Sequence, residues 1–408
     1  MSMKRVVITG LGAVSSLGNS VPAMIDAMET GRSGVRRMDD WSRYKGLQSI
    51  LGAPAELVDV KSIPRQSRRS MGRMSIMAVQ AAQQALGEAG LGHDLVASDR
   101  MGCIIGSTMG GAQALNETFE TMLPDHDLSQ LTSMKFFQCV SHTAAMNTAQ
   151  YLGIRGYVMA TSAACASSLQ ALGAGYDLIR LGKQDAVLCG GSEELHPTVT
   201  ASFDILFATS THFNDDPDNA PRPFDALRDG IVCGEGAGVI VLEEYEHARA
   251  RGAHMYGEII GYNTCGSGDH VSQSNQAAME QCLCAALDEA NVRPGEVDYI
   301  SAHATATVQG DVEEARAIAR VFGHAVPVSS LKGYLGHTLG ASGSIELIAA
   351  LKMQEKGLLY PTRNLKTVAG ECAGIRHVRE MERRDIRVIV KNCFAFGGIN
   401  ASLVCRRI

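Results

Sequence analysis

The sequence lacks several features that would place it in particular classes of protein. It has no apolar run of 18 residues, so we expect no transmembrane helix. It has no basic block, and its 37 Lys and Arg against 43 Asp and Glu give a net charge of −6. This mild acidity argues against nucleic acid as the main partner. The first residues lack a long apolar region ending in a cleavage site, so they predict a buried strand instead of a signal peptide.

Paired cysteine motifs are also missing. The chain has 11 cysteines, an odd number, with no CxxC pair and no ladder of cysteines and histidines. We therefore expect neither a disulfide framework nor a zinc site. Most of the cysteines lie in apolar stretches, which is typical of small buried side chains in a reducing compartment. The expected location is cytoplasmic.

The chain does show a regular alternation of strands and helices. Short apolar runs end in glycine-rich turns, as in RVVITGLG, MGCIIGSTMGG, AVLCGGSE and GVIVLEE. Helical patterns lie between them, over residues 75–90, 168–182, 276–291, 312–323 and 344–357. Strands that alternate with helices predict a layered α/β fold.

A weak internal repeat suggests how the chain is organised. Residues 157–194 and 326–360 both have the pattern of a strand, a turn of small residues, a helix and a strand. We predict two related halves, residues 1–250 and 251–408. No low-complexity linker separates them, so the halves are expected to pack as one body.

The first candidate for chemistry is Cys165, in the segment TSAACASSLQALGAGY. It lies among small residues at the predicted start of a helix. Backbone N–H groups and the positive end of the helix dipole favour a thiolate there. An inert core cysteine is the alternative, and Cys165 taken alone does not exclude it.

Two histidines strengthen the catalytic interpretation. His303 follows an apolar strand in YISAHATATVQGD, and His337 lies in the glycine-rich turn of SLKGYLGHTLGASG. A lone histidine in either place is more often a core or capping residue. A cysteine with two histidines suits thiol acyl transfer, because one imidazole can promote the thiolate and two N–H donors can hold a developing oxyanion or enolate. Periodicity alone does not show that the three residues converge.

These segments resemble the β-ketoacyl-ACP synthases of the elongating (I/II) type, which are condensing enzymes of fatty-acid and polyketide synthesis in the thiolase superfamily. The resemblance spans nearly the whole chain, and its Cys-His-His set differs from the Cys-His-Asn set of starter-type synthases. It implies an α/β thiolase-like fold, in which two pseudo-repeated halves give a layered α-β-α-β-α body. Five motifs carry it in the family's order: residues 5–19, 161–170, 222–238, the segment from His303 to Glu346, and 392–401.

The resemblance also implies roles for individual residues. Cys165 takes the acyl chain, His303 and His337 hold the enolate formed when malonyl-ACP loses CO2, and backbone N–H groups of Cys165 and Phe396 form the oxyanion hole. The resemblance implies that Lys332 and Glu346 form an ion pair that positions the histidines. It implies contacts to the acyl and pantetheine chains for Thr305, Thr307, Met109, Phe394 and Phe396. It implies a docking surface for the acidic carrier protein at Arg65, Arg69 and Arg73.

The expected partners follow from the same resemblance. Substrates arrive on the 4'-phosphopantetheine arm of acyl carrier protein, and no other cofactor and no metal is expected. The chain is expected to form a homodimer, or a heterodimer with a related subunit, through a strand near residues 155–165. The arginines at 65, 68, 69 and 73 have roughly helical spacing, and a solvated helix face is the alternative to a docking surface.

Three positions depart from the family pattern. Ala304, Ala306 and Ala395 stand where the family has glycine. A Cβ at such a position restricts φ > 0 and the mobility of the gate around Phe396, so we predict a narrowed or redirected substrate range. Two alternatives therefore stay open: a specialised polyketide or aryl-polyene ketosynthase paired with a subunit that lacks the cysteine, and a non-catalytic scaffold that sets chain length.

Overall fold

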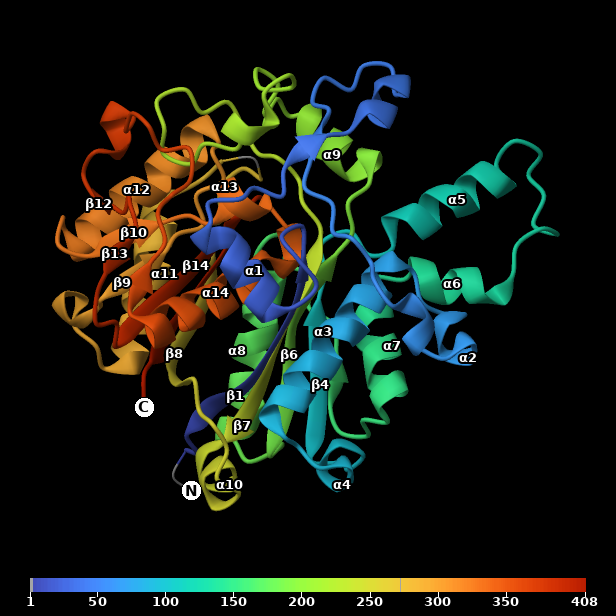
Figure 1. Ribbon diagram of the computed structural model, residues 1–408, viewed down its shortest axis with the longest axis horizontal. Helices are drawn as coiled ribbons and strands as arrows, with labels where there is room; N and C mark the ends of the chain where they lie inside the picture. The colour runs from blue at the N-terminus through green and yellow to red at the C-terminus, as the bar shows by residue number, and fades with distance from the viewer. Residues whose placement is uncertain (1–2, 272) are drawn as a thin grey trace.

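The structure is a computed structural model that describes residues 3–271 and 273–408 (Figure 1). Its main sheet has the strand order β12-β10-β9-β14-β15-β8-β1-β7-β6-β4-β5. A short antiparallel pairing of residues 6–8 with residues 257–259 joins the two halves of this sheet. The first half contains β5 (Val158–Met159), β4 (Met101–Gly106), β6 (Ala186–Glu193), β7 (Gly236–Glu244) and β1 (Val6–Ser15). The second half contains β8 (Gly257–Gly266), β15 (Ile399–Arg406), β14 (Val388–Ala395), β9 (Tyr299–Ser301), β10 (Pro327–Ser329) and β12 (Arg376–His377).

Helices form three layers around the two halves of the sheet. α3 (Arg73–Ala89) and α7 (Thr143–Leu152) cover the outer face of the first half. α11 (Gln276–Ala290) covers the outer face of the second half, and α12 (Val308–Phe322) packs on α11. α8 (Ser167–Arg180) and α14 (Ser342–Lys356) lie between the halves and contact strands of both. The order is thus α-β-α-β-α, which confirms the expected fold.

The composition of β1 and α14 explains their central places. Gly10 and Gly12 of β1 face α3, where an added Cβ would lie 2.1 Å from the carbonyl oxygen of Ala85 or 1.9 Å from that of Ala81. Only glycine permits so close an approach of helix to strand. In α14, 12 of the 15 residues are buried, as expected of a helix that has small or apolar residues on nearly every side.

The predicted helices are all present, and the internal repeat is found in part. β5 and α8 in the first half correspond to β10 and α14 in the second. The strand after α8 is β6, in the middle of the first half-sheet, whereas the strand after α14 is β11 (Leu358–Leu359), which pairs only with β13 (Glu382–Arg383). The counterpart of β6 is β14, because the strand order β5-β4-β6-β7-β1 of the first half matches the order β10-β9-β14-β15-β8 of the second. The repeat therefore continues past the helix, and β11 lies in an insertion before its last two strands.

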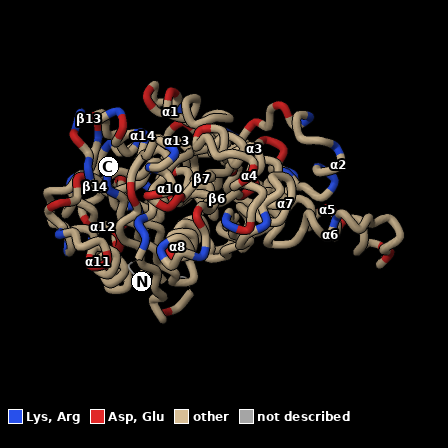
Figure 2. Tube along the Cα trace, turned by 90° about the horizontal axis from the view of Figure 1, so that it is seen from below, with Lys and Arg blue, Asp and Glu red and all other residues tan. Residues whose placement is uncertain are grey.

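Shorter elements surround this body. The hairpin of α5 (Ala112–Met122) and α6 (Ser133–Cys139) projects from it (Figure 1). It carries exposed apolar side chains, among them Phe119, Leu128 and Phe136. Acidic and basic residues are interspersed along the described trace (Figure 2). In the described ranges, no helix combines the length and apolar character that crossing a bilayer requires. The shorter elements are α1 (Val21–Glu29), β2 (Arg36–Arg37), β3 (Leu51–Gly52), α2 (Arg65–Arg68), α4 (His93–Val96), α5 (Ala112–Met122), α6 (Ser133–Cys139), α9 (Pro197–Asp204), α10 (Tyr245–Ala250) and α13 (Lys332–Leu335).

Candidate active site

Cys165 lies in a tight turn directly before α8. The hydroxyl of Ser167 holds this turn, since it donates to the carbonyl of Ala164 at 2.7 Å and accepts from the N–H of Ala163 at 2.8 Å. Ala164 has a left-handed φ of 47°, an uncommon conformation for a residue with a side chain. The helix-start position agrees with the sequence prediction. Burial outweighs the effect of the helix start on ionisation, however. Burial raises the pKa of the Cys165 thiol to about 12, and the charge of Lys332 lowers that pKa by a smaller amount.

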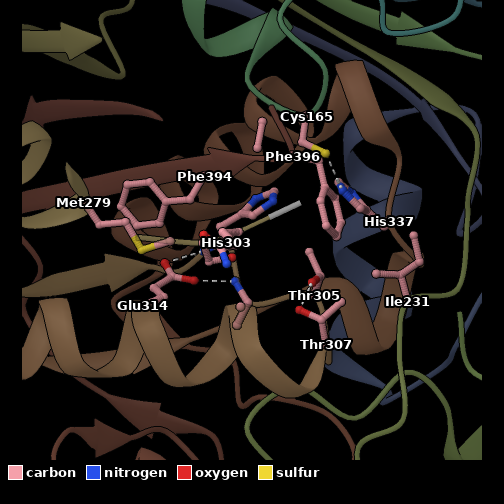
Figure 3. A pocket seen from close by; sticks show the side chains of 15 residues that line it. Cys165, Ile231, Met279, His303, Thr305, Thr307, Glu314, His337, Phe394 and Phe396 are labelled. Carbon is pink, nitrogen blue, oxygen red and sulfur yellow. Dashed lines mark hydrogen bonds between the residues drawn. The ribbon is translucent and has the colours of Figure 1, made fainter. Parts of the chain in front are cut away.

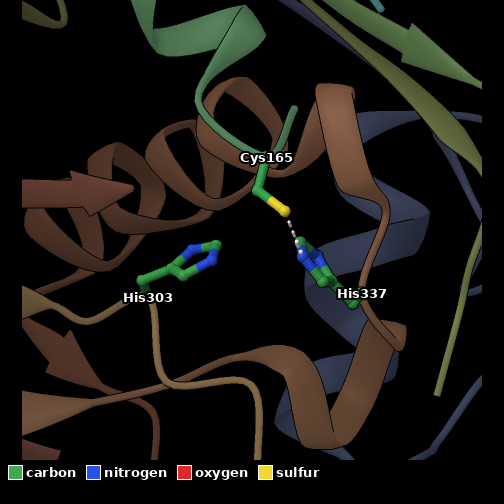
Figure 4. A group of neighbouring side chains, drawn as sticks. All are labelled: Cys165, His303 and His337. Carbon is green, nitrogen blue, oxygen red and sulfur yellow. Dashed lines mark hydrogen bonds between the residues drawn. The ribbon is translucent and has the colours of Figure 1, made fainter. Parts of the chain in front are cut away.

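His337 contacts the sulfur directly. Its Nε2 lies 2.9 Å from the Sγ of Cys165, and its Nδ1 accepts a hydrogen bond of 3.2 Å from the N–H of Leu339 (Figure 4). An imidazole that accepts at Nδ1 carries its proton at Nε2 when neutral. Burial first, and then the charges of Lys332 and Lys391, hold the pKa of His337 well below its usual value. His337 is therefore a neutral N–H donor aimed at the sulfur.

His303 faces the same point from the end of β9. Its ring lies 5.2 Å from that of His337, at an angle of 79°. Its Nδ1 is 3.5 Å from the ammonium of Lys332, so the Nε2–H is the free donor. Glu314 of α12 holds the backbone here, because it accepts from the N–H of His303 at 2.7 Å and of Ala304 at 2.6 Å. Burial, reinforced by Lys332, His337 and Lys391, holds the pKa of His303 well below its usual value.

A buried ion cluster lies behind the histidines. The predicted pair is present, with the Nζ of Lys332 2.7 Å from the Oε1 of Glu346 and both side chains at most 1% exposed. The other carboxylate oxygen of Glu346 lies 2.5 Å from the Nζ of Lys391, which is also fully buried. Sequence reasoning missed Lys391. A lysine inside the apolar run VIVKNCFA was the available signal, because an unpaired buried ammonium is very costly.

A cavity opens beside these groups (Figure 3). Cys165, His303 and His337 line its inner end, and the ring of Phe396 stands between Cys165 and Thr305 in the view of Figure 3. The hydroxyls of Thr305 and Thr307 are 3.1 Å apart. The predicted residues Thr305, Thr307, Phe394 and Phe396 all line the cavity, together with residues that the sequence did not suggest: Ile231, Gln273, Ser274, Met279, Gly310 and Glu314.

Met109 is not among the residues that line this cavity. Its side chain is 41% exposed at the start of the α5–α6 hairpin. Its N–H donates to Glu193, whose buried carboxylate also accepts from the N–H of Thr108 at 2.6 Å and of Gly340 at 3.0 Å. Glu193 thus ties the loop after β4 to the turn after His337. An acyl-pocket role for Met109 stays a prediction.

The arginines do not form one helical stripe. Arg65 lies on α2 and Arg73 begins α3, with Arg69 exposed between the two helices. Arg73 is paired with the buried carboxylate of Glu235 and with the carbonyl of Ala55. The geometry therefore does not favour carrier docking by Arg73, because docking would compete with an internal ion pair. For Arg65 and Arg69 docking remains a prediction.

The three alanines at family glycine positions differ in backbone conformation. Ala306 has a left-handed φ of 68°, so its Cβ stands where glycine carries no strain. Ala304 and Ala395 are not among the described residues with positive φ. The argument from left-handed strain therefore applies to Ala306, and the restriction of the gate by Ala395 stays a prediction.

The same site has a donor set that suits a metal ion. The ligand atoms of Cys165, His303 and His337 lie within 4.8 Å of one another. Sulfur and imidazole nitrogen are the ligands that zinc prefers. A bound ion would occupy the sulfur, however, and nucleophilic chemistry needs the sulfur free.

Comparison with known proteins places the chain among proteins of this geometry. Residues 3–248 match the family described as Beta-ketoacyl synthase, N-terminal domain, and residues 256–366 match its C-terminal domain. The chain is 37% identical to 3-oxoacyl-[acyl-carrier-protein] synthase 1 of Escherichia coli (strain K12), over 100% of both chains. It is similar to the crystal structure of a β-ketoacyl synthase from Burkholderia phymatum STM815, with 43% identity, a TM-score of 0.96 and full coverage of both chains. A further similar structure is the ishigamide ketosynthase/chain length factor, with 30% identity, a TM-score of 0.92 and full coverage of both chains.

Proposed function

The chain belongs to the β-ketoacyl synthase family, and we propose from this membership that Cys165 and the two histidines join an acyl chain to malonyl-ACP with loss of CO2. The protein is thus a condensing acyltransferase of fatty-acid or polyketide elongation. One observation carries the assignment of residues: the sulfur of Cys165 lies 2.9 Å from the Nε2 of His337, and the His303 ring lies 5.2 Å from the His337 ring, at the inner end of one cavity.

The first half-reaction loads the cysteine. The sulfur of Cys165 attacks the thioester carbonyl of an acyl-ACP, the bond from that carbon to the pantetheine sulfur breaks, and the proton of Cys165 leaves on the pantetheine thiol. The backbone N–H groups of Cys165 and Phe396 are the proposed donors to the tetrahedral oxyanion. Burial keeps the thiol of Cys165 protonated in the free enzyme. The thiol therefore loses its proton only after substrate has bound, when the sulfur acts as the nucleophile.

The second half-reaction forms the carbon–carbon bond. Malonyl-ACP loses CO2, and the electron pair of the broken bond becomes an enolate. The Nε2–H groups of His303 and His337 donate to the enolate oxygen, a task that requires both rings to be neutral. The enolate carbon attacks the acyl carbonyl on Cys165, and the carbon–sulfur bond breaks with its electron pair on the sulfur. The Cys165 thiolate then takes up a proton from solvent, and 3-oxoacyl-ACP leaves. The hydroxyls of Thr305 and Thr307 are the proposed contacts to the pantetheine arm, and Lys332 with Glu346 positions His303.

Replacement of the nucleophile tests this function. We expect Cys165→Ala to abolish both acyl-enzyme formation and condensation, because Cys165 is the one thiol among the described residues that line the cavity. We expect Cys165→Gln to retain CO2 release from labelled malonyl-ACP, since an amide imitates the acylated sulfur. Cys405→Ala is the matched control, since Cys405 is also fully buried but lies near the end of β15 and does not line the cavity. Normal 3-oxoacyl-ACP formation by Cys165→Ala would overturn the assignment. Alkylation of Cys165 by iodoacetamide with no loss of function would favour the scaffold instead.

A second candidate within the family is a specialised polyketide or aryl-polyene synthase that acts as a heterodimer. The strained Ala306 and the likeness to a ketosynthase/chain length factor support it. Strand β5 is the edge of the sheet, with Val158 and the neighbouring Tyr157 exposed, and it is the proposed contact to a second subunit. Co-purification of the tagged chain with its genomic neighbours, followed by mass measurement, separates homodimer from heterodimer.

Three further assignments remain proposals. The chain divides near residue 250 into a half that carries the nucleophile and a half that carries both histidines. Its substrates arrive on the phosphopantetheine of acyl carrier protein, and no other cofactor is proposed. A cytoplasmic location is proposed because all eleven cysteines are free, as is usual in reducing compartments.

A further inference from the structure

Lys391 is a second fully buried lysine beside the catalytic histidines. It lies on β14, the strand that continues into Phe394 and the gate residue Phe396. Its Nζ is 2.5 Å from the Oε2 of Glu346 and 3.5 Å from each of the carbonyl oxygens of Ser301 and Ala302. Those carbonyls directly precede His303. Lys391 therefore holds both the carboxylate behind the site and the backbone that carries one histidine.

The charges around His303 balance only when Lys391 is counted. Glu346 on α14 and Glu314 on α12 are both buried. Burial raises the pKa of Glu314, while two backbone N–H bonds and the charges of Lys391 and Lys332 favour its carboxylate form. Lys332 on α13 offsets one of these charges. Lys391 offsets the other: burial lowers the pKa of Lys391, but Glu346 and its other anionic neighbours together raise that pKa by more. The other titratable groups that interact with this cluster are His337, Cys165, Cys393, Tyr299 and Asp311, none of which supplies a cation. Asp311 has its own cation, Arg228, whose Nε lies 4.0 Å from the Oδ2 of Asp311.

The consequence concerns the protonation of His303. Two carboxylates offset by a single lysine would leave a net negative charge beside the imidazole and favour imidazolium. The second ammonium removes this bias, and Lys391 is among the groups that lower the pKa of His303. A neutral ring whose Nδ1 accepts from Lys332 presents Nε2–H to the cavity. This is the donor that enolate stabilisation needs.

We propose that Lys391 is a positioning residue for decarboxylation, which acts through Glu346 and the carbonyls before His303 to keep that histidine a neutral donor. The inference rests on the proposed function and deepens it. Lys391 lies behind the histidines and does not line the cavity. It therefore serves the enolate step, while the loading of Cys165, on the other half of the molecule, does not depend on it.

Two substitutions of Lys391 test this role. Lys391→Met removes the charge and the donor, and Lys391→Gln removes the charge while keeping a donor. In both, we expect CO2 release from malonyl-ACP to fall about 10- to 100-fold, as for other groups that orient a reacting side chain. We expect acylation of Cys165 to change less than about threefold. The acid limb of the pH profile of CO2 release should move up by about one pH unit, because loss of a nearby cation raises the pKa of an imidazole.

The matched control is Lys356→Met. Lys356 ends α14, about 15 Å along the helix from Glu346, and pairs with Glu29 near the surface. It should leave both rates and the pH profile unchanged. Thermal unfolding identifies a variant that does not fold. If Lys391→Met does not fold, the rates and the pH profile of Lys391→Gln decide the test.

Two results would overturn the proposal. One is a folded variant with the CO2 release and acid limb of the wild type. The other is an equal loss of acylation and CO2 release with no shift in pH, which is what a merely structural role gives. Absence of CO2 release in the wild type would instead overturn the proposed function itself, a result that no Lys391 variant imitates.

Discussion

The two central helices occupy corresponding places in the two halves and carry different chemistry. The first, α8, begins two residues after Cys165, whose sulfur is held by a strained turn and by hydrogen bonds of the Ser167 hydroxyl. The second, α14, contributes Glu346, a carboxylate buried between two lysines. The first half thus supplies the sulfur that bonds the acyl chain, and the second half supplies the buried charges and the two imidazole N–H donors. Duplication of a scaffold leaves each copy free to specialise in one step.

The largest effect on this comparison should come from removal of a donor in the second half. We expect His303→Ala and His337→Ala each to lower CO2 release from malonyl-ACP by about 10²–10³-fold, the usual cost of losing one oxyanion donor. Some acylation of Cys165 should persist, because the first half is intact. His254→Ala, a surface histidine, is the control. Unchanged CO2 release in both site variants would contradict the assignment of the enolate step to the second half.

The pH dependence sharpens the same comparison. Burial and the lysines hold the pKa values of both histidines well below the usual value of about 6.5. Each ring therefore stays neutral through that pH, and protonation sets in only well below it. We expect CO2 release by Cys165→Gln to be flat between about pH 6 and pH 8. A half-maximal rate near pH 6.5 would show that at least one ring titrates normally.

A smaller effect is expected on the surface of the first half. Reversal of charge in Arg69→Glu should raise the KM for acyl-ACP about tenfold, with little change for acyl-pantetheine, because the lost contact is with the carrier protein. The effect should shrink in salt, since exposed charges are screened beyond ~10 Å at 0.1 M. Arg293→Glu is the control, as Arg293 is exposed on another part of the chain. Equal KM values for Arg69→Glu and wild type would show that Arg69 is a solvated surface residue and not part of a docking surface.

The smallest effect should come from the alanines in the second half. Ala306→Gly relieves a left-handed alanine, a strain of about 1–2 kcal/mol that the entropy of glycine in the unfolded chain offsets in part. We expect a small rise in unfolding temperature and a wider range of saturated acyl-ACP substrates. Ala395→Gly is the matched comparison, since Ala395 carries no such strain. If a panel of saturated and polyunsaturated acyl-ACPs gives the same rates in all three proteins, the alanines do not select substrate.

Local sequence patterns were sufficient to predict most of the main helices and strands and their arrangement in layers. The periodicity of residues 344–357 predicts α14, and the alternation of strands and helices predicts the layers. The predicted pair of Lys332 and Glu346 came from motif resemblance, and the structure contains it. Other inferences failed because a neighbour distant in the chain decides them. The sequence predicted that Arg73 is a surface charge, but in the structure it is paired with Glu235. The sequence around Lys391 did not indicate that Glu346 is its partner.

By itself, the sequence determined the elements, their order and the identity of the reactive side chains. These depend on apolar periodicity, glycine placement and motifs, which are properties of short segments. Only the tertiary structure decided how Cys165, His303 and His337 converge, which tautomers their partners impose, and that burial keeps the thiol protonated. Convergence joins residues far apart in the chain, and burial depends on every layer around them. Ionisation depends on both, because desolvation and neighbouring charge act through space and not along the chain.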